Sequence, residues 1–140
     1  MKNGLLFVFG GVAYGLIEVV VRQETHWSML IAGGLCFLVV GGINAAFGRL
    51  PLLAKIVIFS VLVTAIEFMF GCVFNLHFGM NVWDYRTMPL NLYGQVCLPF
   101  MGLWALLGLV AFPIHETLSS RLDRRQYWRG SKLAKMADTN

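Results

Sequence analysis

The sequence predicts an all-α membrane protein with four transmembrane helices. Of its 140 residues, 58% are hydrophobic and 13% are charged, and the mean hydropathy is +0.70. A soluble domain typically has about a quarter of its residues charged. Four apolar stretches are each long enough to cross a hydrocarbon core of about 30 Å, which takes about 20 residues. The length predicts a single domain. We place this transmembrane domain at residues 1–113, and the remaining residues, 114–140, form a basic tail.

The four spans are expected at about residues 4–21, 27–47, 51–75 and 91–112. The first carries a glutamate and is followed by no cleavage pattern, which indicates a retained span rather than a signal peptide. Pro51 suits the first turn of the third span, where a missing N–H does no harm. Pro99 lies inside the expected fourth span, so the sequence predicts a kink near Gln95.

The basic residues predict the orientation. With four spans, the N-terminus, the middle loop and the C-terminus share one side, which carries Lys2, Arg49, Lys55 and six basic residues of the tail. The opposite side carries Arg22 and Arg86. Basic residues in short loops favour the cytoplasmic side. We therefore predict a multi-pass protein of the cell membrane (inner or plasma membrane) with both termini in the cytoplasm.

The tail predicts contact with lipid. Ile114, Leu118 and Leu122 follow one another at intervals of four, with arginines among them. This pattern is typical of an amphipathic helix that lies on the inner leaflet and is attracted to anionic lipid. The alternative is a simple positively charged anchor. Because the charge belongs to this tail beside an apolar body, we expect the bilayer and not nucleic acid as its partner.

Two matching patterns predict an internal repeat. A glutamate follows Leu-Ile at 16–18 and Ala-Ile at 65–67, and Gly, Cys and Gly recur at the same spacing within 33–41 and 94–102. These patterns predict two tandem two-helix repeats related by an axis along the membrane normal, with a shared site between them. In the second half the cysteine follows the glutamate by 30 positions, against 18 positions in the first half. The additional residues correspond to the loop at 77–89.

Polar and small residues follow one face of the first and third spans. On the third span they are Ser60, Thr64, Glu67, Gly71 and Asn75, and on the first Gly11, Gly15, Glu18 and Arg22. Spacings of three and four place such residues on one face of a helix. Small and polar residues favour contact with other helices over contact with lipid. Both faces are therefore predicted to point inward.

Four ionisable residues are expected to gather in the outer half of the membrane. Glu67 lies roughly 20 Å from the cytoplasmic end of its span, Glu18 lies near an outer end, and Asp84 and Arg86 belong to the outer loop. A charged residue at a helix centre costs about 2.5 to 3.5 kcal/mol on insertion scales. One interpretation is a binding or proton-handling site with Glu67 as its deepest group. The other is a set of structural ion pairs, Glu18 with Arg22 or Asp84 with Arg86.

The loop between the third and fourth spans mixes aromatic, charged and turn-forming residues. Trp83 and Tyr85 suit a membrane interface. Irregular backbone at membrane depth is tolerated only where protein or water satisfies it. The loop therefore either lies on the surface or dips inward as a lid.

Known catalytic and metal-binding motifs do not occur in the sequence. His26 and His77 lack the spacing of paired metal ligands, and the three cysteines form no CxxC motif. No Walker A sequence, Rossmann glycine pattern or GxSxG motif occurs. We predict no catalytic residue, no bound metal and no cofactor.

A set of motifs in the second half resembles a known family. They are Glu67-x-x-x-Gly71, Trp83-Asp84-Tyr85, Pro89-x-Asn91-x-x-Gly94-x-x-Cys97-Leu98, and Trp104. The chain resembles the CmpB-like family described as putative ABC-transporter type IV over most of residues 4–113, with Arg86 where the family usually has serine. The resemblance implies a permease role.

The leading hypothesis is a transporter, or a transporter subunit, for a small solute or ion. Four helices form a narrow pathway, so we expect a homo-oligomer or a partner subunit. Two alternatives are a non-transporting assembly protein and an intramembrane lipid-modifying enzyme with Glu67 and Asp84 as acid and base. The candidate substrate- or ion-binding residues are Glu67, Glu18, Asp84, Arg86, Trp83, Tyr85, Asn91 and Gln95.

Overall fold

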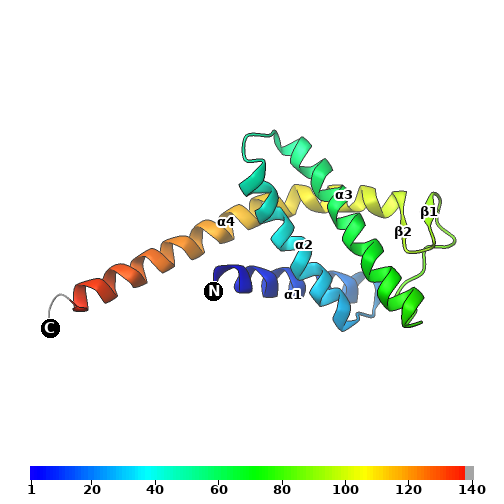
Figure 1. The fold of residues 1–140 in the computed structure, drawn as a ribbon, viewed down its shortest axis with the longest axis horizontal. Helices are drawn as coiled ribbons and strands as arrows, with labels where there is room; N and C mark the ends of the chain where they lie inside the picture. Colours follow the sequence, from blue (N-terminus) through cyan, green and yellow to red (C-terminus); the bar gives the residue numbers. More distant parts are fainter. Residues whose placement is uncertain (138–140) are drawn as a thin grey trace.

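The computed structural model describes residues 1–137, apart from the side chains of residues 21–22 and 129–137. The elements, in order, are α1 (Lys2–Arg22), α2 (Trp27–Ala46), α3 (Leu52–Phe70), the π-helix η1 (Gly71–His77), β1 (Asn91–Leu92), β2 (Val96–Cys97) and α4 (Leu98–Ala137) (Figure 1). The π-helix continues directly from α3, which moves the end of the third span from the expected residue 75 to His77.

The predicted all-helical membrane architecture is confirmed. Within the described residues, four helical segments are long and apolar enough to cross a membrane: Lys2–Val20, Trp27–Ala46, Leu52–His77 and Leu98–Trp128. Many large apolar side chains on these segments point away from the protein, such as Leu16 at 61% exposed and Leu53 at 74%. Outward apolar side chains are expected where lipid takes the place of water.

Local sequence explains where the second and third helices begin. The ring of His26 accepts a hydrogen bond from the backbone N–H of Ser28 at 3.3 Å and so caps α2. Pro51 is the N-cap residue of α3, with φ −63°. Its ring cannot continue a helix toward the N-terminus, because it has no N–H to donate.

The fourth helix differs from the prediction at its start. α4 begins at Leu98 and not near Asn91, so Pro99 falls in its first turn, where proline is favoured, and the expected kink near Gln95 is wrong. Residues 91–97 instead form an antiparallel hairpin, β1 with β2. Its turn passes through Tyr93 and Gly94, both at positive φ (52° and 68°). Two successive positive φ values match the twist of a hairpin.

Beyond the apolar part, α4 continues as one helix. It runs through Pro113 to Ala137, a total of 40 residues. Its distal part extends away from the other helices (Figure 1). The tail is thus a direct extension of the fourth span in this structure, and a separate helix lying on the membrane remains a prediction.

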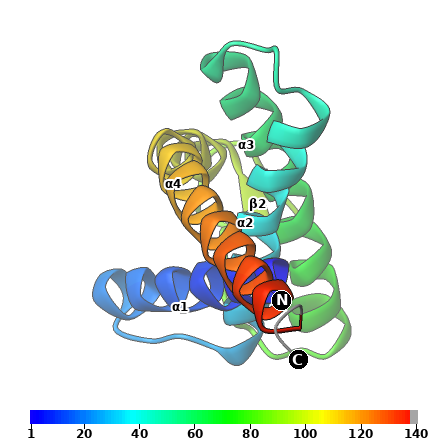
Figure 2. The ribbon, with the colours of Figure 1, turned by 90° about the vertical axis from the view of Figure 1, so that its left-hand side faces the viewer.

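The helices cross one another and do not form a parallel bundle. Both views show α1 running at an angle to α2 and α3 (Figures 1 and 2). α1 packs mainly on α2, and α3 packs on α4 and α2. Gly11 permits the first contact, because a Cβ there would lie 2.5 Å from the carbonyl oxygen of Leu30. The main apolar core lies among α2, α3 and α4 and contains Val40, Ile43, Ile56, Phe59, Val63, Trp104 and Phe112.

The predicted inward faces are confirmed. Glu67 and Asn75 are buried on the third span, and Glu18 is buried on the first. The side chain of Arg22 lies outside the described residues. The predicted repeat is not matched in local structure, since Cys36 lies within a helix whereas Cys97 lies in β2.

Candidate carboxylate site at the loop end of the helices

The carboxylate of Glu67 connects three parts of the chain. Glu67 lies on α3 and is 5% exposed. Its Oε1 accepts a hydrogen bond from the hydroxyl of Tyr85 at 3.0 Å, and its Oε2 accepts one from the indole Nε1 of Trp104 at 2.9 Å. Hydrogen bonds to a charged acceptor are about twice as strong as neutral ones. One side chain therefore fastens both the loop that carries Tyr85 and the helix that carries Trp104.

The space around this carboxylate is nearly full. A cavity of about 10 Å³ lies beside Glu67, lined also by Tyr14, Cys36, Trp83 and Trp104, among others. That is about the volume that one water molecule requires. In this conformation the cavity is too small for a solute.

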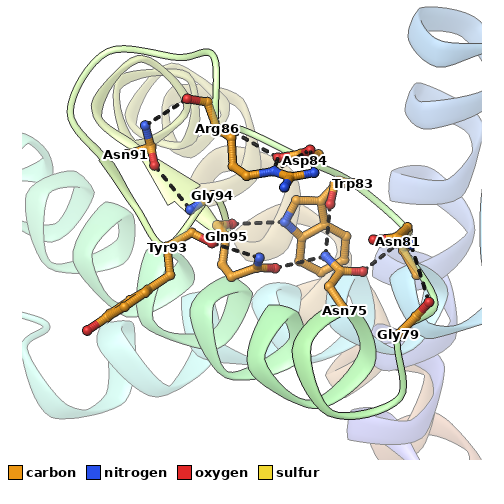
Figure 3. Close-up of polar contacts among 11 residues, drawn as sticks. Asn75, Gly79, Asn81, Trp83, Asp84, Arg86, Asn91, Tyr93, Gly94 and Gln95 are labelled. Carbon is orange, nitrogen blue, oxygen red and sulfur yellow. Dashed lines mark hydrogen bonds and ion pairs between the residues drawn. The ribbon is translucent and has the colours of Figure 1, made fainter.

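The loop at residues 78–97, which we call the α3–α4 loop, is held by a buried amide network (Figure 3). Asn75 of η1 donates to the carbonyl of Trp83 at 3.0 Å and to the side-chain oxygen of Gln95 at 2.9 Å. Its own oxygen accepts from the backbone N–H of Val82 at 2.7 Å. The indole of Trp83 donates to the carbonyl of Gln95 at 2.8 Å. Asn75, Trp83 and Gln95 are all buried, so the loop is fixed to the end of the third span.

Two glycines permit this packing. A Cβ at Gly71 would lie 2.6 Å from the side-chain oxygen of Gln95. A Cβ at Gly94 would lie 2.5 Å from Cγ of Arg86, and Gly94 also has a positive φ of 68°. The π-helix that begins at Gly71 presents Asn75 to the loop, and π-helical turns occur frequently at functional sites.

Tyr85 is positioned from two directions. Its ring stacks on Phe100 of α4, with centroids 4.5 Å apart. Its backbone N–H donates to the carbonyl of Gly94 in the hairpin turn at 2.8 Å. Both contacts restrain the ring whose hydroxyl reaches Glu67.

Asp84 and Arg86 form an ion pair at the surface, apart from Glu67. The guanidinium and carboxylate are 2.6 Å apart, and their side chains are 46% (Asp84) and 76% (Arg86) exposed. Hydrogen bonds from the side chain and then the backbone N–H of Arg86 lower the pKa of Asp84. The same contact raises the pKa of Arg86. The expected gathering of four ionisable groups is thus divided, with these two facing solvent.

The remaining predicted residues have local partners. Glu18 is 5% exposed and accepts a hydrogen bond from the hydroxyl of Thr25 at 2.9 Å. The amide of Asn91 donates to the carbonyls of Arg86 and Met88 and accepts from the N–H of Gly94. Asn91 therefore shapes the loop at the surface and does not reach Glu67.

Two residues that contact this site were not among the predicted site residues. Trp104 binds Glu67 directly, and Asn75 organises the loop. An indole N–H inside an apolar span usually needs an acceptor, which was the available indication for Trp104. Asn75 had been assigned to an inward face but not to the loop contact.

No metal cluster is formed by the part of the chain that the structure describes. His26 caps α2 and packs beside Trp27 and Phe74. His77 packs against Phe78. Both histidines therefore have structural surroundings of their own.

These helices and this carboxylate define a small multi-pass membrane protein with a buried polar site closed by a loop. The model of the family described as "Putative ABC-transporter type IV" matches residues 2–136, and the chain belongs to this family. No curated protein and no solved structure matches the chain.

Proposed function

We propose that this protein is a transporter for a small solute, or the membrane subunit of one, and that Glu67 controls opening at the loop end. The observation that carries the proposal is the pair of hydrogen bonds that Glu67 accepts from Tyr85 and Trp104. An ionisable residue inside a transmembrane segment is a functional candidate by default, because its burial is costly. Membership of a family described as transporter-related supports the same conclusion.

The chemistry of the two donors suggests how protonation of Glu67 would open the α3–α4 loop, which would then act as a gate. The indole of Trp104 can only donate, whereas the hydroxyl of Tyr85 can donate or accept. A protonated Glu67 can still accept from Trp104 with one oxygen and donate its own proton to Tyr85. Both contacts then become neutral and weaker. Proton binding would therefore loosen the α3–α4 loop without disrupting the helices.

Other titratable groups surround this carboxylate. Tyr14 of α1 and Cys36 of α2 line the same cavity. Tyr85 approaches from the loop, and Glu18 of α1 is close enough to interact with the Glu67 charge. Glu18 is the second candidate for a coupling carboxylate.

The orientation and assembly are part of the proposal. The basic residues favour cytoplasmic termini, which places the Glu67 end of the helices outside. The tail would then meet anionic lipid on the inner leaflet. This sequence contains no Walker A motif, so ATP-driven transport would need an ATPase outside these 140 residues. A second copy or a partner subunit would widen the narrow pathway.

A second candidate function is that of a non-transporting assembly protein. The cavity of about 10 Å³ beside Glu67 favours it, because the carboxylate then acts as a connector between segments. Under this alternative, a change at Glu67 that removes its hydrogen bonds alters stability alone.

Proton movement in liposomes separates the two functions. Wild-type protein and Glu67→Gln are reconstituted into liposomes that enclose a pH-sensitive dye, and solutes are added outside the liposomes. Glu24→Gln is the matched control, because Glu24 is an exposed glutamate in the turn between α1 and α2. We expect solute-dependent proton movement in wild type and Glu24→Gln and its loss in Glu67→Gln. Equal movement in all three would refute the role of Glu67, and absence of movement in all three, together with a less stable Glu67→Leu, would favour the assembly protein.

A further inference from the structure

A large polar cavity opens at the opposite end of the helices from Glu67. Its volume is about 740 Å³, which is in the usual range of about 300 to 1,000 Å³ for small-molecule sites. It lies where the start of α1, the end of α2, the start of α3 and the part of α4 after Pro113 meet. Lys55 in its wall and Glu67 are roughly 18 Å apart along α3. We call it the tail-end cavity.

His115 gives the wall of this cavity a polar group with unused hydrogen-bonding capacity. Its side chain is 6% exposed, although it lines the cavity. The ring packs on Phe37 at 5.3 Å and against Gly41, where a Cβ would lie 2.8 Å from Nε2. Within the described residues, neither ring nitrogen has a hydrogen-bond partner. The ring lines the cavity, so water or a ligand in the cavity supplies the hydrogen-bond partner of its nitrogens.

The charges in the wall define what the ligand carries. Lys2 and Asp123 neutralise each other through an ion pair of 2.7 Å. Lys55 and Glu116 remain, and neither forms an ion pair with another described residue. Asn44 joins them, because it accepts from Lys55 at 3.0 Å and donates to Glu116 at 3.5 Å. The cavity therefore presents the ammonium of Lys55 and the carboxylate of Glu116, one on each side of the Asn44 amide.

We propose that the tail-end cavity binds a small zwitterion that carries a carboxylate and an ammonium group, as a free amino acid does. The carboxylate contacts the ammonium of Lys55, and the ligand's ammonium contacts the carboxylate of Glu116. His115 and Ser119 bond the remaining polar atoms. A zwitterion pairs with both wall charges, whereas a ligand with a single charge pairs with only one of them, so the zwitterion should bind more tightly.

This inference deepens the proposed function, since it names the class of solute, and it rests on that function for any role in transport. In the structure the Glu67 end is closed and the tail end is open. A zwitterion would enter from the side of the termini. It would pass the α3–α4 loop only after Glu67 releases that loop. Binding itself is independent of that release.

Binding to the full-length protein in lipid nanodiscs tests the inference. Each of the twenty standard amino acids is titrated singly by calorimetry. The amino acid that binds most tightly is then compared with its analogue without the amino group and with its analogue without the carboxyl group. We expect each analogue to bind about tenfold more weakly or worse, the loss expected when a charged hydrogen bond disappears.

Variants assign the site. Lys55→Gln and Glu116→Gln should each weaken binding by about tenfold or more, and Arg49→Gln, a change at an exposed cation outside the lining, should not. Glu116 is exposed, so its variant should fold even if Lys55→Gln does not. Glu67→Gln should bind normally, so failure of the gate and failure of this site are distinguishable.

Three results would overturn the inference. One is a deaminated acid that binds as tightly as the amino acid, with Glu116→Gln unchanged, which indicates an anion site. The second is a decarboxylated amine that binds equally well, with Lys55→Gln unchanged. The third is folded wild-type protein that binds none of the twenty amino acids.

Discussion

The indole of Trp104 donates a hydrogen bond of 2.9 Å to Oε2 of Glu67, across 37 residues of sequence. Because an indole can only donate, the contact requires an acceptor at position 67. The other oxygen of Glu67 holds Tyr85. The carboxylate thus connects α3 to α4 and to the loop between them, and the following predictions test that arrangement.

Glutamine should replace Glu67 with little loss of stability, and leucine should not. Glutamine can accept from Trp104 and donate to Tyr85, whereas leucine leaves both donors without a partner. We expect Glu67→Leu to unfold with a free energy about 1 to 3 kcal/mol lower than that of Glu67→Gln. Thermal unfolding in detergent, followed by circular dichroism, measures the difference. Equal stability of the two variants would show that the hydrogen bonds contribute nothing.

The effect of Trp104 should depend on residue 67. Trp104→Phe removes the N–H and leaves Oε2 without that donor, so we expect it to lower the free energy of unfolding by about 1 to 3 kcal/mol. In the Glu67→Leu background the same change should have a smaller effect, because no acceptor remains. A double-mutant cycle measures the coupling. Additive effects would contradict a direct contact.

Gly94→Ala should disturb the hairpin more than Gly79→Ala. Both glycines have a positive φ, 68° and 65°, and therefore share the same backbone strain on substitution. A Cβ at Gly94 also meets Arg86, whereas nothing lies within 4 Å of one at Gly79. We expect a larger fall in the unfolding midpoint for Gly94→Ala. Equal falls would indicate that the contact with Arg86 adjusts freely.

Gly71→Ala should loosen the loop. Its Cβ would lie 2.6 Å from the side-chain oxygen of Gln95, and displacement of Gln95 should expose the neighbouring Cys97, which is 3% exposed. With the other two cysteines replaced by alanine, we expect faster maleimide labelling of Cys97. Gly102→Ala is the control, because nothing lies within 4 Å of its Cβ. Unchanged labelling in Gly71→Ala would show that the loop does not depend on this contact.

The Asp84–Arg86 pair should contribute a small, acid-sensitive stability. The pKa of Asp84 is lowered from its usual 3.8, so its contribution is present above that value and is lost as the pH falls through the lower folded-state pKa. Because both side chains are exposed, salt should weaken the effect. We expect Asp84→Asn to match wild type at pH 7 in high salt and to lose less stability below about pH 4. A large loss at pH 7 would assign Asp84 a structural role.

The proposed role of Glu67 in proton movement can be tested separately from its hydrogen bonds. Because Glu67→Gln preserves hydrogen bonding and removes charge, a folded Glu67→Gln protein that moves no protons would assign the role to the charge. A folded variant with normal proton movement would leave Glu67 a structural connector.

The sequence by itself determined the class of protein, the four apolar helices and the inward faces of the first and third spans. These properties are local, because span length depends on about 20 consecutive apolar residues and the inward face on the helical repeat. Glu67 was therefore identified as buried and polar, and Tyr85 as a neighbouring candidate. The two-repeat organisation and the separate tail helix stay predictions.

Only the tertiary structure decided which groups meet. Asp84 and Arg86 pair with each other at the surface, while Tyr85 and Trp104 reach Glu67. Residues 91–97 form a hairpin whose carbonyls accept hydrogen bonds from the backbone of Tyr85, the indole of Trp83 and the side chain of Gln95, although the sequence predicted a span there. The tail-end cavity joins Lys2, Asn44, Lys55 and Glu116 from four helices. Such contacts depend on how the helices cross, because sequence patterns report the face of one helix and not the partner that covers it.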